Sequence, residues 1–182
     1  MRNRREDRRG GDDGGSGGGP SRYQMRDDLL TFGDDFWIED THGNKAYKVD
    51  GKAVRVRDTL EFEDAHGNVQ AKIQSRVARI ADTMEVEDAH GKRAALVKKA
   101  LITPVRERFT VKVADGPDLD IKGNILDHEY KIGDVAEVSK KWFRIRDTYG
   151  VEVSPGQDDA IILAVTVVID QMQKREDEGT NG

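Results

Sequence analysis

The sequence predicts an all-β domain, either a barrel or a sandwich, on three observations. A short motif recurs with a strict period, so that Asp40, Asp64 and Asp88 are each 24 residues apart. Apolar and polar residues alternate through the repeated segments, which is the pattern of half-buried strands. Turn signals recur about every 8–12 residues, a spacing typical of all-β domains. The 182 residues then hold about a dozen strands, a number at which an open sheet usually curls or closes.

The two ends of the chain are expected to be disordered arms. Residues 1–21 are rich in arginine, aspartate and glycine and have no aliphatic or aromatic residue between Met1 and their end. Residues 174–182 are also polar, so ordering either arm would bury little apolar surface. The arms therefore flank a single domain at residues 22–173. The N-terminal arm lacks the continuous apolar stretch of a secretory signal, which favours a cytoplasmic protein, with peripheral attachment to a membrane left open.

Each copy of the repeat predicts a strand, a turn and a returning strand. In the turn sequence Asp-x-x-Gly, the aspartate can bond the backbone of a type I turn and the glycine can take a positive φ. The copies at residues 36–43, 60–67 and 84–91 are close, and those at 109–116 and 143–150 are looser. Further strands are expected at residues 54–57, 129–132, 135–138 and 142–145.

The apolar run at residues 160–169 is a core element whose type the residues alone leave open. Ser154 and Gln157 match a capping box, and Pro155 suits the first helical position, so a helix start is signalled. The run itself is rich in β-branched residues, which would suit a buried strand. With ten residues, it is too short for the roughly 20 that a transmembrane helix needs.

The meander of short strands with Asp-x-x-Gly turns, followed by one wholly apolar segment, resembles the LURP-one-related family. Residues 57–64 (RDTLEFED) and 158–164 (DDAIILA) strengthen the resemblance, which covers about residues 22–173. It implies the fold of the tubby C-terminal domain and, more distantly, of phospholipid scramblases: a closed antiparallel barrel of about twelve strands around a central hydrophobic helix. The residues of that core helix would be Ile161, Ile162, Leu163, Val165, Val167, Val168 and Ile169.

The resemblance brings no catalytic motif and no cofactor, so we expect a non-catalytic protein. Tubby domains bind phosphoinositides, which implies binding of an anionic phospholipid headgroup or membrane surface. The headgroup candidates are two pairs of outward arginines on predicted strands, Arg55 with Arg57 and Arg144 with Arg146. The alternative is a solvated exterior in which nearby glutamates balance these charges. Trp37 and Trp142 could anchor at a membrane interface, although large aromatic residues on strands are more often core.

Other chemistries find less support in the sequence. His42, His66 and His90 could hold zinc at one rim of a barrel, or they could be exposed turn residues on hairpin tips about 10 Å apart. His128 could act as an acid or base but has no nucleophile at a recognisable spacing. The absence of cysteine excludes disulfides and thiolate metal sites. The net charge of -5 argues against a broad nucleic-acid interface. The alternative function is a scaffold that binds a protein partner, and the oligomeric state stays open.

Overall fold

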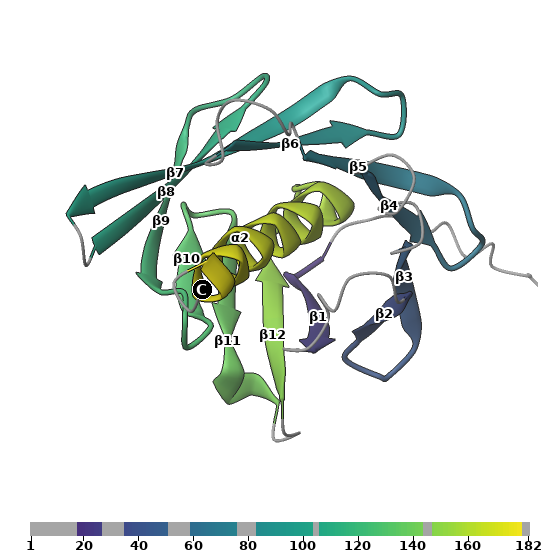
Figure 1. Ribbon diagram of the computed structural model, residues 1–182. Coiled ribbons are helices and arrows are strands. Elements are labelled where there is room, and N and C mark those ends of the chain that lie inside the picture. The colour runs from purple at the N-terminus through teal and green to yellow at the C-terminus, as the bar shows by residue number, and fades with distance from the viewer. Residues whose placement is uncertain are drawn as a thin grey trace, which may run out of the picture.

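The chain forms a closed barrel of twelve antiparallel strands with one long helix along its interior (Figure 1). The computed structural model describes residues 18–26, 35–50, 59–75, 83–103, 106–143 and 147–179. Strand order around the barrel follows the sequence, and β1 closes the ring by pairing with β12. The strands are β1 (Ser21–Arg26), β2 (Phe36–Asp40), β3 (Lys45–Asp50), β4 (Thr59–Asp64), β5 (Val69–Ser75), β6 (Thr83–Asp88), β7 (Arg93–Thr103), β8 (Arg106–Val113), β9 (Leu119–Asn124), β10 (Glu129–Ile132), β11 (Ala136–Ser139) and β12 (Thr148–Val153).

The repeated motif forms the hairpin turns that the sequence predicts. In the β4–β5 turn, the Asp64 carboxylate accepts hydrogen bonds from the backbone N–H of His66 at 2.8 Å and of Asn68 at 2.9 Å. The Gly67 N–H donates to the Asp64 carbonyl, which closes the turn, and Gly67 has a φ of 84°. The bonds from Asn68 also lower the pKa of Asp64 below its ordinary value. Equivalent bonds form at Asp40 and Asp88, so the three turns share the same hydrogen-bonding pattern.

Because successive strands run in opposite directions, five hairpin turns and the β12–α2 connection meet at one end of the barrel. We call this end the mouth and the opposite end the far end. Ser21 at the start of β1 pairs with Val153 at the end of β12, so the described chain also starts at the mouth. Alternate side chains of every strand point inward and form one core with the helix.

The helix α2 (Asp159–Gly179) begins at the mouth and fills the barrel (Figure 1). Its apolar segment is enclosed as expected: Ile162, Leu163, Val165, Val167, Val168 and Ile169 are buried, and Ile161 is partly buried against the same core. A twelve-stranded ring is too wide for strand side chains alone to fill, and the helix supplies the missing apolar volume. Within the described residues, no helix combines the length and apolar character needed to cross a membrane.

The helix starts and ends later than the sequence suggests. The predicted capping box is wrong, because Asp158 caps the helix by accepting from the backbone N–H of Ile161 at 3.2 Å. Ser154 instead donates from its hydroxyl to the Asp134 carbonyl at 2.9 Å, and Pro155 lies in a turn before the helix. At the other end, α2 runs to Gly179, six residues beyond the expected boundary of the domain at residue 173.

Two further expectations fail in the loosest copy of the repeat. The predicted strand at residues 142–145 begins instead in a 3-10 helix, η1 (Lys140–Trp142), which Ser139 caps through its side chain. The predicted turn at residues 147–150 is mostly strand, because Thr148 starts β12 and Gly150 pairs with Gln24 of β1. Residues 147–150 do match the turn motif of the repeat, but their pairing with β1 and β11 determines the structure instead. The expected strand at residues 54–57 lies outside the described residues.

Candidate functional site

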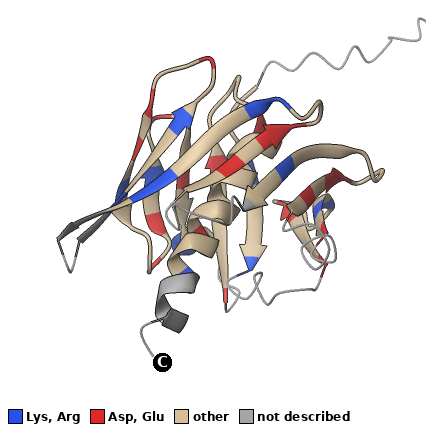
Figure 2. Cartoon of the chain, turned by 45° about the horizontal axis from the view of Figure 1, so that its top comes forward, with Lys and Arg blue, Asp and Glu red and all other residues tan. Residues whose placement is uncertain are grey.

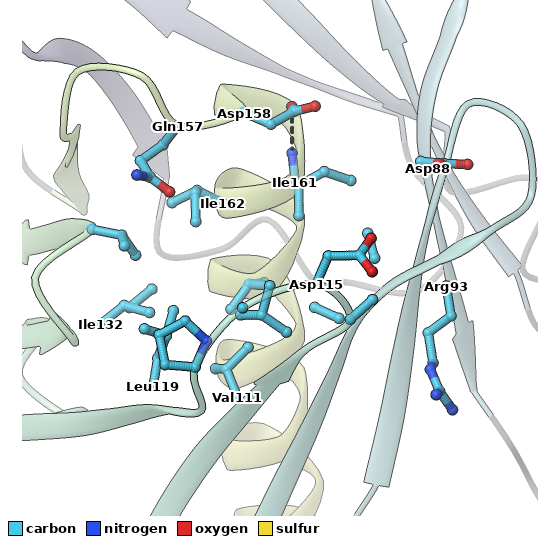
Figure 3. A pocket seen from close by; sticks show the side chains of 18 of the residues that line it. Asp88, Arg93, Val111, Asp115, Leu119, Ile132, Gln157, Asp158, Ile161 and Ile162 are labelled. Carbon is cyan, nitrogen blue, oxygen red and sulfur yellow. Dashed lines mark hydrogen bonds between the residues drawn. The ribbon is translucent and has the colours of Figure 1, made fainter.

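A pocket of about 580 Å³ opens at the mouth of the barrel, beside the start of α2 (Figure 3). Its lining comes from the β6–β7, β8–β9 and β10–β11 turns, the adjoining strands, and residues 157–165. The space exists because α2 is not centred in the ring. Its main contacts are with β5, β6 and β7, which leaves a gap on the side of β8, β9 and β10.

The walls of this pocket are apolar. Side chains that are buried in the core also face the pocket, so its floor is continuous with the barrel interior. Ile161 is the exception among the predicted helix residues, because it is only partly buried and lines the opening. The main apolar lining residues are Ala95, Val111, Leu119, Ile132, Ile162 and Val165.

The rim of the pocket is acidic. Asp88, Asp115, Asp134 and Asp158 all line it. One cation, Lys92, faces them and places its Nζ 2.9 Å from a carboxylate oxygen of Asp115. Arg93 also borders the pocket but extends away from it along the opposite side of its strand (Figure 3), in line with its pairing with the outward residue Glu87. Carboxylates therefore outnumber the cations that point into the opening.

The start of α2 is also held by a tyrosine pair. The Tyr23 hydroxyl on β1 donates to the Asp159 carboxylate at 2.5 Å, and its ring lies 5.8 Å from that of Tyr47 on β3. Burial, and then the bond to Asp159, raises the pKa of Tyr23 far above its ordinary value. Burial likewise raises the pKa of Tyr47. These contacts fix the helix to the β1–β3 side of the mouth.

A second polar cluster lies deeper in the barrel, toward the far end. The Tyr149 hydroxyl on β12 donates to the Asp170 carboxylate on α2. The His128 ring stacks on Tyr149 with 4.2 Å between centroids, and its Nε2 is 3.6 Å from an oxygen of Asp170. His128 itself has a φ of 51° in the turn between β9 and β10. The sequence showed His128 but not its partners, because they are brought in by strands and a helix far along the chain.

Both tryptophans lie on the outer wall of the barrel, which corrects the expectation that they are core. Trp37 is flanked on β2 by the inward residues Phe36 and Ile38, so it points outward, and Lys45 Nζ lies 4.5 Å from its ring centroid. Trp142 follows β11, and the guanidinium carbon of Arg22 on β1 lies 5.3 Å from the centroid of its ring. Each indole is partly exposed and has a cation beside it.

Gly150 makes room for the Trp142 ring on the outer wall. A Cβ at this position would lie 2.8 Å from the Trp142 ring and 2.7 Å from the Phe143 ring, so both rings pack directly on the outer face of β12. Since β1 alone separates β12 from β2 in the ring, the two tryptophans share one wall. We call the surface formed by Arg22, Trp37, Lys45 and Trp142 the tryptophan face.

The four predicted headgroup arginines lie outside the described residues. Arg55 and Arg57 fall between β3 and β4, and Arg144 and Arg146 fall between η1 and β12. The described neighbours of the second pair are informative: Phe143 packs at Gly150, and Thr148 pairs with Arg26 of β1. Phe143, the last described residue before this pair, therefore lies beside the tryptophan face.

The three repeated histidines lie at the tips of separate hairpins. The side chains of His42 and His66 are 82% and 86% exposed, and His90 is also exposed. No group of three histidine, aspartate or glutamate side chains suited to a metal ion occurs in the described ranges. Elsewhere on the wall, basic and acidic side chains alternate (Figure 2) and form cross-strand ion pairs such as Lys72 with Glu61 at 3.0 Å and Lys131 with Glu137 at 3.1 Å.

The fold is therefore that of a closed twelve-stranded antiparallel β-barrel that encloses one hydrophobic helix. The LURP-one-related family model matches residues 21–170, and the chain belongs to this family. The barrel is also similar to the crystal structure of an Arabidopsis thaliana protein, with a TM-score of 0.61 and 20% sequence identity, covering 85% of this chain and 91% of that one. A comparison with curated proteins gives no match.

Proposed function

We propose that this LURP-one-related barrel is a non-catalytic cytoplasmic protein that binds an anionic phospholipid surface. The contact is made by the tryptophan face, to which Arg144 and Arg146, between η1 and β12 in the sequence, would add positive charge. The observation that carries the proposal is the placement of both tryptophans on one outer wall, each with a cation beside its ring.

Tryptophan and a long basic side chain are a suitable pair for a membrane interface. The indole combines an apolar body with a polar N–H group, so it lies at the level of the headgroups. Lys45 extends beside the Trp37 ring, where its charge would meet phosphate groups, at about 1 kcal/mol for a basic residue near an anionic surface. Arg22 lies beside the Trp142 ring and pairs with Glu152 of β12 at 2.5 Å, so a phosphate group would compete with that carboxylate for its guanidinium. Arg55 and Arg57, which lie between β3 and β4 in the sequence, would add to the same contact.

The charge of the mouth supports an approach by this side wall over an approach along the barrel axis. Each of the six connections at the mouth carries an aspartate, and these carboxylates would repel anionic headgroups. The start of α2 also occupies part of the mouth, and the opening beside it is lined by aspartates. The resemblance to tubby domains, which bind phosphoinositides, supports the same class of ligand.

Co-sedimentation with vesicles tests the proposal. We expect the protein to pellet with vesicles that contain phosphatidylserine or a phosphoinositide, and not with pure phosphatidylcholine vesicles. Pelleting should weaken between low and physiological salt, because ions screen the contact. The variant Arg22→Gln/Lys45→Gln should bind roughly tenfold or more weakly, whereas Lys98→Gln/Lys112→Gln, with two cations on β7 and β8 across the barrel, should bind like the wild type.

A scaffold that binds a protein partner is the alternative function. The partly exposed tryptophans would also suit a protein interface, where aromatic residues and arginine are enriched. The same experiment separates the two. No pelleting with any vesicle composition, by a protein that melts cooperatively, would contradict the lipid proposal and favour the scaffold.

A further inference from the structure

The pocket at the mouth lies away from the tryptophan face, and the proposed membrane contact does not use it. We propose that this pocket binds a small amphiphilic amine, a molecule with an apolar body and one protonated nitrogen. The body would enter between α2 and the strands β8 to β10, and the nitrogen would remain at the rim among Asp88, Asp115, Asp134 and Asp158. The proposal does not rest on lipid binding by the outer wall.

The size and walls of the pocket suit a small ligand. A volume of about 580 Å³ lies within the range of pockets that hold small organic molecules, and apolar walls with a few polar groups at the opening are typical of them. The partly exposed lining residues Val113, Val135 and Ile161 provide apolar contact for an alkyl or aromatic group, and buried side chains such as Val111 and Val165 support them from below.

The charges at the rim favour a positively charged ligand. Four aspartates line the pocket, and the single inward cation, Lys92, is already paired with Asp115. The positive end of a helix dipole would otherwise favour an anion here. At the start of α2, two carboxylates already occupy the place that an anion would take. Asp158 accepts from the Ile161 N–H, and Asp159 accepts from the Tyr23 hydroxyl. An anion would therefore meet net negative charge, and a cation would be attracted.

The rim is held in place before any ligand binds. Ser154 donates from its backbone N–H to the Val135 carbonyl and from its hydroxyl to the Asp134 carbonyl, both at 2.9 Å. The Gly133 N–H donates to the Asp120 carbonyl at 2.9 Å. A Cβ at Gly133 would lie 2.9 Å from the Leu119 side chain, so the β10–β11 turn packs closely against the pocket wall. A preformed rim lowers the entropic cost of binding.

Three compounds that differ only in the charge of one end test the proposal with the full chain. Decylammonium, decanol and decanoate, each below its micelle concentration and without vesicles, are titrated into the protein by calorimetry at neutral pH. We expect decylammonium to bind roughly tenfold more tightly than decanol, and decanoate to bind more weakly than decanol. Equal affinity for decylammonium and decanoate, or no binding of any of the three, would overturn the proposal.

Two sets of variants locate the binding. Asp115→Asn/Asp134→Asn removes two exposed rim charges without touching the core, so decanol affinity should stay unchanged while the preference for decylammonium falls at least severalfold. Asp118→Asn, an exposed carboxylate that pairs with Lys112 and does not line the pocket, is the matched control and should retain the full preference. A preference unchanged by the rim variant, or binding that depends on dimer formation in light scattering, would show that this pocket is not the amine site.

Discussion

The Tyr149 hydroxyl on β12 donates a hydrogen bond to the Asp170 carboxylate on α2, and this contact joins the wall of the barrel to its axis. Both side chains are buried, Tyr149 completely. A hydrogen bond to a charged acceptor in such a place is stronger than a neutral one. It orients a helix whose other contacts are mostly apolar and therefore not directional.

Removal of the donor should destabilise the protein. We expect Tyr149→Phe to reduce the free energy of unfolding by about 1–3 kcal/mol, because the Asp170 carboxylate loses a partner while it stays buried. Urea unfolding followed by circular dichroism measures the loss. An unchanged midpoint would show that the bond does not hold α2 in place.

The opposite outcome is expected at Tyr130. Its hydroxyl is buried and has no hydrogen-bond partner in the described part of the chain. Tyr130→Phe removes this unsatisfied group and keeps the ring, so the free energy of unfolding should stay the same or rise by about 1 kcal/mol. A loss above 1 kcal/mol in the same urea assay would mean that the hydroxyl has a favourable contact.

The stability of the protein should fall at alkaline pH. Burial raises the pKa of Tyr23, and the Asp159 carboxylate raises it further, while burial also raises the pKa of Tyr130. The folded protein keeps these protons, whereas the unfolded chain begins to release them at about pH 10. The stabilisation is therefore fully present below about pH 10 and is lost as the pH rises above it.

A matched variant isolates the contribution of Tyr23 to this pH dependence. Tyr23→Phe should show a shallower loss of stability between about pH 10 and 11.5 than the wild type, in melting temperatures measured across that range. Parallel curves for the two proteins would mean that Tyr23 ionises alike in the folded and unfolded states.

A charge on the buried face of α2 should prevent folding. Val165 is 1% exposed at the centre of the barrel, and Val165→Asp would bury a carboxylate with no designed partner. Ile161→Asp, at the partly buried start of the same helix, is the control and should cost much less. A soluble Val165→Asp protein that melts cooperatively would show that the helix is not central to the fold.

Much of the fold could be predicted because its signals are local. The 24-residue repeat carries its own turn bonds, as Asp64 and Gly67 show, and alternation identifies the strands on both sides. The run at residues 160–169 was different, since β-branched residues suit a buried strand or a buried helix equally. The family resemblance, and not the periodicity, favoured the helix that the structure has.

The functional features depend on contacts that no local pattern encodes. The pocket arises from the off-centre packing of α2, and the Tyr149–Asp170 pair joins two residues that are 21 positions apart in the sequence. The outward direction of Trp37 could be inferred from its inward neighbours Phe36 and Ile38, but a preference for aromatic core residues obscured it. The sequence pattern does not identify Asp158 as the cap, because Ser154 and Gln157 match the capping-box motif more closely.

The most direct test of the proposed function uses the tryptophans themselves. The chain has only 2 tryptophans, and both belong to the tryptophan face, so their fluorescence reports on this surface alone. Addition of phosphoinositide-containing vesicles should shift the emission to shorter wavelength, and brominated acyl chains should quench it, while phosphatidylcholine vesicles should do neither. Binding to anionic vesicles with no change in emission and no quenching would place the contact elsewhere and contradict the account.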